Sequence, residues 1–126
     1  LALSGNTAPY MLYSYARING IIQKAGGGEF ISDEVVFTEE EEKTLARVLA
    51  RFSPVLAELE RDLRPNVLCD FLFDTSQAFN RFYEQCPVNQ APTPEIKNTR
   101  ITLCLATRHI LRQGLEILGI RVIEKM

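Results

Sequence analysis

Apolar side chains recur every three or four residues along most of this chain, a spacing that predicts amphipathic helices rather than strands. The first predicted helix covers residues 8–25, with Thr7 as its cap, Pro9 in its first turn and the glycines at 26–28 at its end. Its apolar stripe, which should face a core, contains Met11, Tyr15, Ile18, Ile22 and Ala25.

A second stripe on the same helix, about 130° from the first at 100° per residue, carries aromatic rings and cations: Tyr10, Tyr13, Arg17 and Lys24. Aromatic rings stack on nucleic-acid bases, and cations neutralise phosphate. Helical spacing taken alone favours a different interpretation, in which the tyrosines border the core and keep their hydroxyls in water.

Residues 38–41 have the pattern of a capping box, with Thr38 accepting from a backbone amide and Glu41 reaching back. The acidic run also suits the positive end of a helix dipole, although an acidic docking patch is the alternative. The second helix should reach about Phe52, and Ser53-Pro54 should restart or kink it toward Leu63.

A third helix is predicted from about 66 to 85, with its apolar side formed by Leu68, Phe71, Leu72, Thr75, Phe79 and Phe82. Residues 88–93 should form a loop. The last helix should run from Thr93-Pro94 to Gly119 and bury Leu103, Ala106, Ile110 and Ile117. The remaining residues are too few for another helix and should be extended.

These elements predict an all-α fold, an antiparallel bundle of four to five helices with a short extended C-terminal tail, in one domain over residues 1–126. Four cations of the last helix lie within about 120° of each other and would form a basic ridge: Lys97, Arg100, Arg108 and Arg112. Such a ridge suits phosphate, but a solvated helix face is the simpler interpretation.

Composition is that of an ordinary soluble globular protein, with 46% hydrophobic and 24% charged residues. The net charge of −2 does not by itself indicate a nucleic-acid binder. No apolar run approaches the roughly 20 residues that span a bilayer, so we expect no membrane partner and a cytoplasmic location. The chain starts without methionine, so we expect a C-terminal fragment of a longer protein.

Candidate catalytic or metal-binding groups are sparse. The cysteines Cys69, Cys86 and Cys104 are odd in number and lack a Cys-x-x-Cys pair, so we expect buried thiols in a reducing compartment. His109 is the only histidine; we expect it to be partly buried, and we expect no zinc site. Asp70 and Asp74 should form an exposed or ion-paired face. No phosphate-binding glycine loop or nucleophile elbow occurs, so no catalytic residue is assigned.

Three motifs stand out: the opening Ser4-Gly5-Asn6-Thr7-Ala8-Pro9-Tyr10 with Tyr13 and Arg17, the run from Asp74 to Val88 that includes Asn80-Arg81-Phe82-Tyr83, and the ending Leu115 to Met126. Together they resemble the C-terminal part of arginyl-tRNA synthetases. The resemblance covers essentially the whole chain in the right order. The letters Asp-Ala-Leu-Arg, which give this DALR-type domain its name, do not occur consecutively, and the catalytic signatures of the family are absent.

The resemblance implies a helical anticodon-binding domain of a class I synthetase, the ligase that joins arginine to its tRNA using ATP with magnesium. The chain itself should bind tRNA without catalysing and without a cofactor, and its partners should be the tRNA for arginine and the catalytic domain. The implied tRNA-binding residues are Tyr13, Arg17, Asn80, Arg81, Tyr83 and Met126, with Tyr10 as the member that supports the helix or touches RNA. The alternative function is a helical protein-interaction domain, with other synthetases among its partners.

Overall fold

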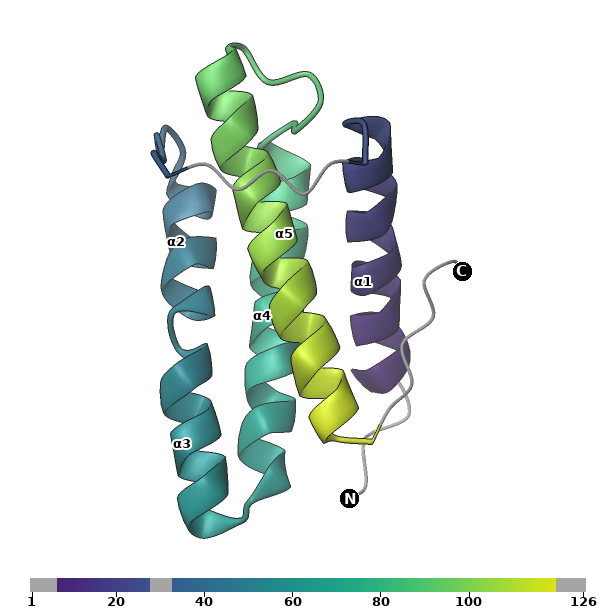
Figure 1. The fold of residues 1–126 in the computed structure, drawn as a ribbon, viewed down its shortest axis with the longest axis vertical. Coiled ribbons are helices and arrows are strands. Elements are labelled where there is room, and N and C mark those ends of the chain that lie inside the picture. The colour runs from purple at the N-terminus through teal and green to yellow at the C-terminus, as the bar shows by residue number, and fades with distance from the viewer. Residues whose placement is uncertain (1–6, 28–32, 120–126) are drawn as a thin grey trace.

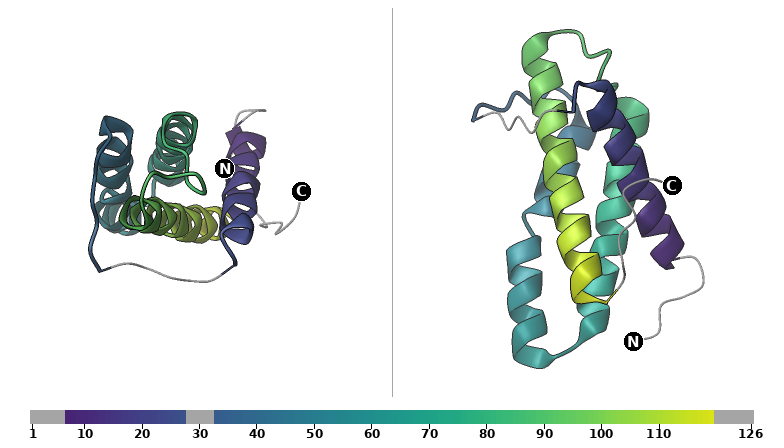
Figure 2. Two further views of the ribbon diagram at one scale, coloured as in Figure 1. Left: turned by 90° about the horizontal axis from the view of Figure 1, so that it is seen from above. Right: turned by 45° about the vertical axis from the view of Figure 1, so that its right-hand side comes forward.

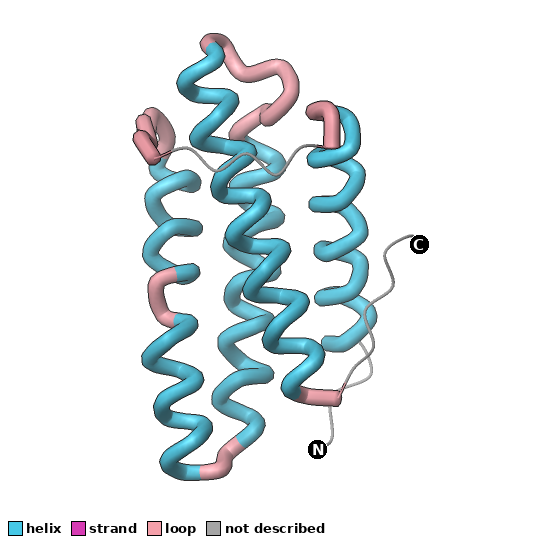
Figure 3. The backbone as a smooth tube through the Cα atoms, in the orientation of Figure 1, coloured by secondary structure: helices cyan, strands magenta, loops and turns pink. Residues whose placement is uncertain are grey.

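Five helices make up the described part of this computed structural model, residues 7–27 and 33–119, where no strand occurs (Figures 1 and 3). They are α1 (Thr7–Lys24), α2 (Glu40–Leu49), α3 (Phe52–Asp62), α4 (Pro65–Gln85) and α5 (Pro94–Ile117). Helices α2 and α3 follow one another in nearly the same direction. Counting them as one unit, α1, α2–α3, α4 and α5 run in alternating directions (Figure 1). The predicted helical bundle is confirmed, whereas the predicted C-terminal tail lies outside the described residues.

Helices α4 and α5 occupy the centre of the bundle (Figure 2). Helices α1 and α2 each pack against both of them, whereas the main contact of α3 is with α4. The largest hydrophobic side chains that are almost completely buried between these helices are Met11, Tyr15, Ile18, Leu45, Leu68, Phe71, Leu72, Phe79, Phe82, Leu111 and Leu115. The apolar stripes predicted for the first and third helices therefore face the core, as expected.

The ends of the helices follow from proline, glycine and capping residues. Pro65 begins α4, where its missing N–H costs no hydrogen bond, and Thr93 caps α5 by accepting from the backbone N–H of Ile96 at 3.2 Å. Gly119 follows α5 with a φ of 81°, a left-handed conformation that suits glycine. Thr7 is the first described residue of α1, and its predicted capping role stays a prediction.

The break between α2 and α3 falls at residues 50–51, earlier than the predicted restart at Ser53-Pro54. Pro54 lies in the first turn of α3, and a proline ring clashes with the carbonyl four residues before it in a continuous helix. The disfavoured carbonyl is that of Ala50, so the helix is interrupted there and not at the proline.

Three predicted positions on α5 differ in the structure, and the first is Ala106, which is only partly buried. Ile117 is 50% exposed, because the buried face is centred on Cys104, Thr107, Leu111 and Gly114 and Ile117 falls at its edge. Arg100 is buried, so it is missing from the basic ridge predicted for Lys97, Arg100, Arg108 and Arg112.

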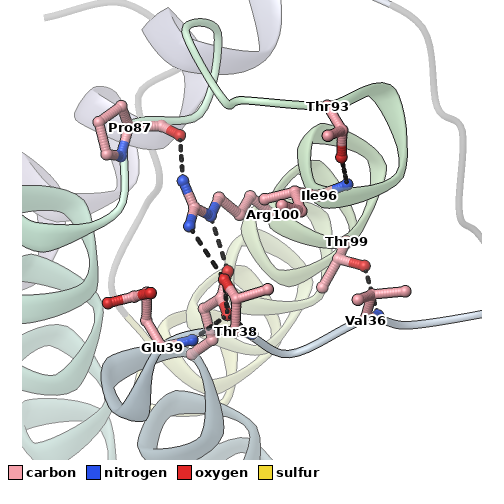
Figure 4. Close-up of polar contacts among 9 residues, drawn as sticks. Val36, Thr38, Glu39, Pro87, Thr93, Ile96, Thr99 and Arg100 are labelled. Atoms are coloured by element: carbon pink, nitrogen blue, oxygen red, sulfur yellow. Dashed lines mark hydrogen bonds and ion pairs between the residues drawn. The ribbon is translucent and has the colours of Figure 1, made fainter.

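Arg100 instead joins three segments at one end of the bundle (Figure 4). Its Nε donates to Oε2 of Glu42 at 2.7 Å, and its Nη1 donates to the carbonyl of Pro87 at 2.8 Å. Oε1 of Glu42 accepts from the backbone N–H groups of Thr38 and Glu39. The capping box is therefore one residue later than predicted, with Glu39 as N-cap and Glu42 in place of Glu41.

Burial alone would raise the pKa of Glu42, but the hydrogen bonds from Arg100, Glu39 and Thr38 and the charge of Arg100 outweigh it, and the pKa is lowered from 4.5. A lowered pKa in the folded state means that the unfolded state takes up protons first as the pH falls. The ionised Glu42 therefore stabilises the fold at neutral pH, and this contribution is lost in acid.

We expect Glu42→Gln to lower the free energy of unfolding at pH 7, because the neutral amide cannot pair with the buried guanidinium of Arg100. The difference from the unmodified chain should shrink as the pH falls below 4.5, the ordinary pKa of this group. Urea unfolding at several pH values checks this, and a difference that stays constant down to acid pH contradicts it.

Two glycines inside helices offer a matched test of packing. A Cβ on Gly114 would stand 2.5 Å from Cδ2 and 3.0 Å from Cγ of Leu72, whereas a Cβ on Gly20 would meet nothing within 4 Å. We expect Gly114→Ala to destabilise the fold by about 1–3 kcal/mol through overpacking. Gly20→Ala should stabilise it by about 0.5–1 kcal/mol through helix propensity. Equal effects of the two substitutions in urea unfolding would contradict the close packing of α5 on α4.

Candidate functional site

The second stripe of α1 meets the last third of α4 on one side of the bundle. Tyr13 is 53% exposed on α1 and Tyr83 is 40% exposed on α4, two large aromatic side chains at the surface. Arg17, one turn after Tyr13, extends between them. We call Tyr13, Arg17 and Tyr83 the Tyr–Arg–Tyr cluster.

The guanidinium of Arg17 contacts both rings of the cluster. Its central carbon lies 4.3 Å from the centroid of the Tyr83 ring and 5.0 Å from that of Tyr13, distances typical of cation–π contacts. Its Nη2 also donates to the hydroxyl of Tyr13 at 3.1 Å. Arg17 pairs with no carboxylate of the described residues, so its positive charge remains available to an anion.

Asn80 holds Arg17 from the protein side. Its Oδ1 accepts from Nη1 of Arg17 at 2.8 Å, and its Nδ2 donates to the hydroxyl of Tyr10 at 2.8 Å and to Oγ of Ser14 at 3.1 Å. The Tyr10 ring in turn packs against Phe73 of α4, with centroids 5.5 Å apart. Asn80 and Tyr10 are both partly buried and link the two helices.

A shallow hollow runs from the cluster along α1. It is lined by the cluster together with Ala16, Gly20, Ile21 and Lys24. Ala16 and Gly20 are small and leave room for the hollow, and the exposed Lys24 adds a cation at its far end. A larger hollow near the start of α5 includes Pro92, Pro94 and Lys97 but no aromatic ring, so it lacks a platform for bases.

Two rings, a fixed guanidinium and a further cation suit a single-stranded nucleic acid. Unstacked bases can lie on the tyrosine rings, and phosphate can bind those N–H groups of Arg17 that Asn80 and Tyr13 do not engage.

The structure brings together five of the predicted site residues: Tyr10, Tyr13, Arg17, Asn80 and Tyr83. Arg81 is exposed but lies about 100° around α4 from Asn80, so it is outside the cluster and its contact with tRNA stays a prediction. Met126 lies outside the described residues. Asn80, which the resemblance implies to be a tRNA-binding residue, is bound between the helices because α1 supplies three partners for its amide.

Sequence reasoning missed Ser14 and Phe73. Ser14 is completely buried, and its hydroxyl donates to the Tyr10 carbonyl at 3.1 Å while accepting from Asn80. A serine between two stripes of a helix gives no signal by itself. Only the partner on α4, 66 positions away, reveals its role.

The candidate catalytic or metal-binding side chains, which are the cysteines, His109, Asp70 and Asp74, do not belong to the Tyr–Arg–Tyr cluster. Burial raises the pKa of the Cys104 thiol to about 12, whereas His109 is exposed, contrary to the partial burial predicted for it. Cys86 is buried as predicted, but Cys69 is only partly so. Asp74 pairs with Arg51 at 3.3 Å, in line with the predicted ion-paired face.

A family model described as the DALR anticodon binding domain matches residues 11–126, which contain every element of the cluster. The chain belongs to this family. The Tyr–Arg–Tyr cluster therefore lies within a DALR domain.

The relatives of this DALR domain are larger proteins, and the chain matches only a part of each. The chain is 48% identical over 126 residues to the arginine–tRNA ligase of Parasynechococcus marenigrum, with all of this chain and 21% of the relative covered. It is 49% identical over 129 residues to that of a Synechocystis strain, again over the whole chain and 22% of the relative. The chain thus spans about a fifth of the length of these curated relatives.

Solved structures agree with the sequence relatives. The Thermus thermophilus arginyl-tRNA synthetase superposes with a TM-score of 0.86 at 30% identity, covering 99% of this chain and 22% of that one. The Plasmodium falciparum enzyme gives a TM-score of 0.81 at 30% identity, covering 98% of this chain and 22% of that one.

Among the described residues of this DALR domain, no helix has the length and apolarity of a membrane span.

Proposed function

We propose that the Tyr–Arg–Tyr cluster of this DALR domain binds the unstacked anticodon loop of the tRNA for arginine. The observation that carries the proposal is the guanidinium of Arg17 held against two exposed tyrosine rings. Bases splayed out of the loop would stack on Tyr13 and Tyr83, and Arg17 would bind the adjoining phosphate.

The domain would serve a longer protein that ligates arginine to tRNA using ATP. This proposal is supported by the names of the relatives and by the share of their length that the chain covers. Anticodon binding would let such an enzyme select its tRNA and orient the acceptor end toward a catalytic domain in the same chain. A protein-interaction domain, the other function considered, has no feature in its favour that the RNA-binding function lacks.

Single substitutions in the cluster test the proposal. We expect Tyr13→Ala and Tyr83→Ala each to weaken binding of an arginine tRNA by about 1–3 kcal/mol, because each removes a stacking platform. Tyr13→Phe should bind more tightly than Tyr13→Ala, since it keeps the ring. Filter binding or fluorescence anisotropy measures the dissociation constants, with thermal unfolding to show that each variant is folded.

Arg17→Ala and Arg81→Ala remove the same charge at different places, so they form a matched pair. The logarithm of the association constant falls with the logarithm of the salt concentration, and loss of one phosphate contact should make this slope less steep by about 0.7 for single-stranded RNA. We expect that reduction for Arg17→Ala and a smaller change for Arg81→Ala. An unchanged slope for Arg17→Ala, or tRNA affinity that no cluster substitution alters, would exclude the cluster as the binding site.

A further inference from the structure

We propose that Asn80 is a positioning residue that fixes Arg17 for the RNA and does not itself contact RNA. This inference rests on the proposed function and assigns Asn80 a role different from the one that the family resemblance implies. The carrying observation is that its amide is already engaged by α1 through Arg17, Tyr10 and Ser14.

The orientation of the Asn80 amide follows from chemistry. A guanidinium can only donate hydrogen bonds, so the atom of Asn80 that faces Arg17 must be the carbonyl oxygen. The amide nitrogen is therefore turned toward Tyr10 and Ser14. Because the Ser14 hydroxyl donates to the Tyr10 carbonyl, its oxygen is free to accept from Asn80.

Both N–H bonds of the Asn80 amide are thus directed at α1, at 2.8 Å to Tyr10 and 3.1 Å to Ser14. An amide has two donors, so none remains for a base or a phosphate. One lone pair of the oxygen accepts from Arg17, and the side chain is partly buried between α1 and α4. Asn80 can therefore influence RNA binding mainly through the position of Arg17.

The benefit of this arrangement is preorganisation. A free arginine side chain has many rotamers, and ordering it on binding weakens the complex. Asn80 holds one Nη of Arg17, the Tyr13 hydroxyl holds the other, and the Tyr83 ring packs against the guanidinium. The ordering cost is therefore met when the domain folds and not when it binds RNA.

A double-mutant cycle tests this role with Asn80→Ala, Arg17→Ala and the combined variant. We expect Asn80→Ala to weaken binding of an arginine tRNA by about two- to tenfold, the effect of leaving one long side chain to be ordered on binding. In the Arg17→Ala background the same substitution should have almost no effect. An equal fold-change in both backgrounds would show a direct RNA contact and overturn the proposal.

A measurement without RNA keeps the outcome independent of the proposed function. The order parameter of the Arg17 Nε–H bond, from NMR relaxation, should fall in Asn80→Ala and stay unchanged in Gln85→Ala. Gln85 is an exposed amide at the end of the same helix, so it controls for loss of an amide group. An Arg17 guanidinium that remains as ordered without Asn80 would contradict the positioning role even if the domain does not bind tRNA.

Tyr10→Phe provides a second variant should Asn80→Ala fail to fold. It removes one partner of the Asn80 amide and keeps the ring that packs on Phe73. We expect a smaller loss of tRNA affinity that again disappears in the Arg17→Ala background. Persistence of that loss in the Arg17→Ala background would count against the proposal, whereas failure of Arg17→Ala to alter binding would count against the proposed function.

Discussion

The donor-only chemistry of Arg17 determines how the candidate site is built. A guanidinium between two helices needs an acceptor that carries no competing charge, and the side-chain oxygen of Asn80 supplies it at 2.8 Å. A carboxylate there would bind Arg17 more strongly but would also neutralise it. The neutral amide leaves the positive charge available and fixes its position between Tyr13 and Tyr83, which is what an anionic, unstacked ligand requires.

The rest of the bundle keeps α1 and α4 in the relation that this contact needs. Gly114 lets α5 pack closely against Leu72, so that both helices of the site rest on a common support. At the end of the bundle Arg100 links the start of α2 to the carbonyl of Pro87, just after α4. The Gly114–Leu72 packing and the Arg100 contacts lie inside the bundle. The exposed side of the site carries aromatic rings and cations instead.

Local signals in the sequence predicted much of this fold. The Thr93-Pro94 pair marked a helix start, and most positions of the apolar stripes are buried, because capping and periodicity act within a few residues. The sequence did not predict the burial of Arg100 or the internal role of Asn80. Both depend on partners 58 to 70 positions away, and the spacing of a single helix cannot reveal such partners.

The most direct test of RNA binding by the cluster is NMR of the tyrosine rings during titration with an RNA hairpin that carries an arginine anticodon loop. Stacked bases shift nearby ring protons upfield, so the Tyr13 and Tyr83 signals should move. The Tyr15 signals should stay in place, because that side chain is completely buried. Saturating RNA that leaves the Tyr13 and Tyr83 signals unmoved would show that the RNA does not bind on these rings.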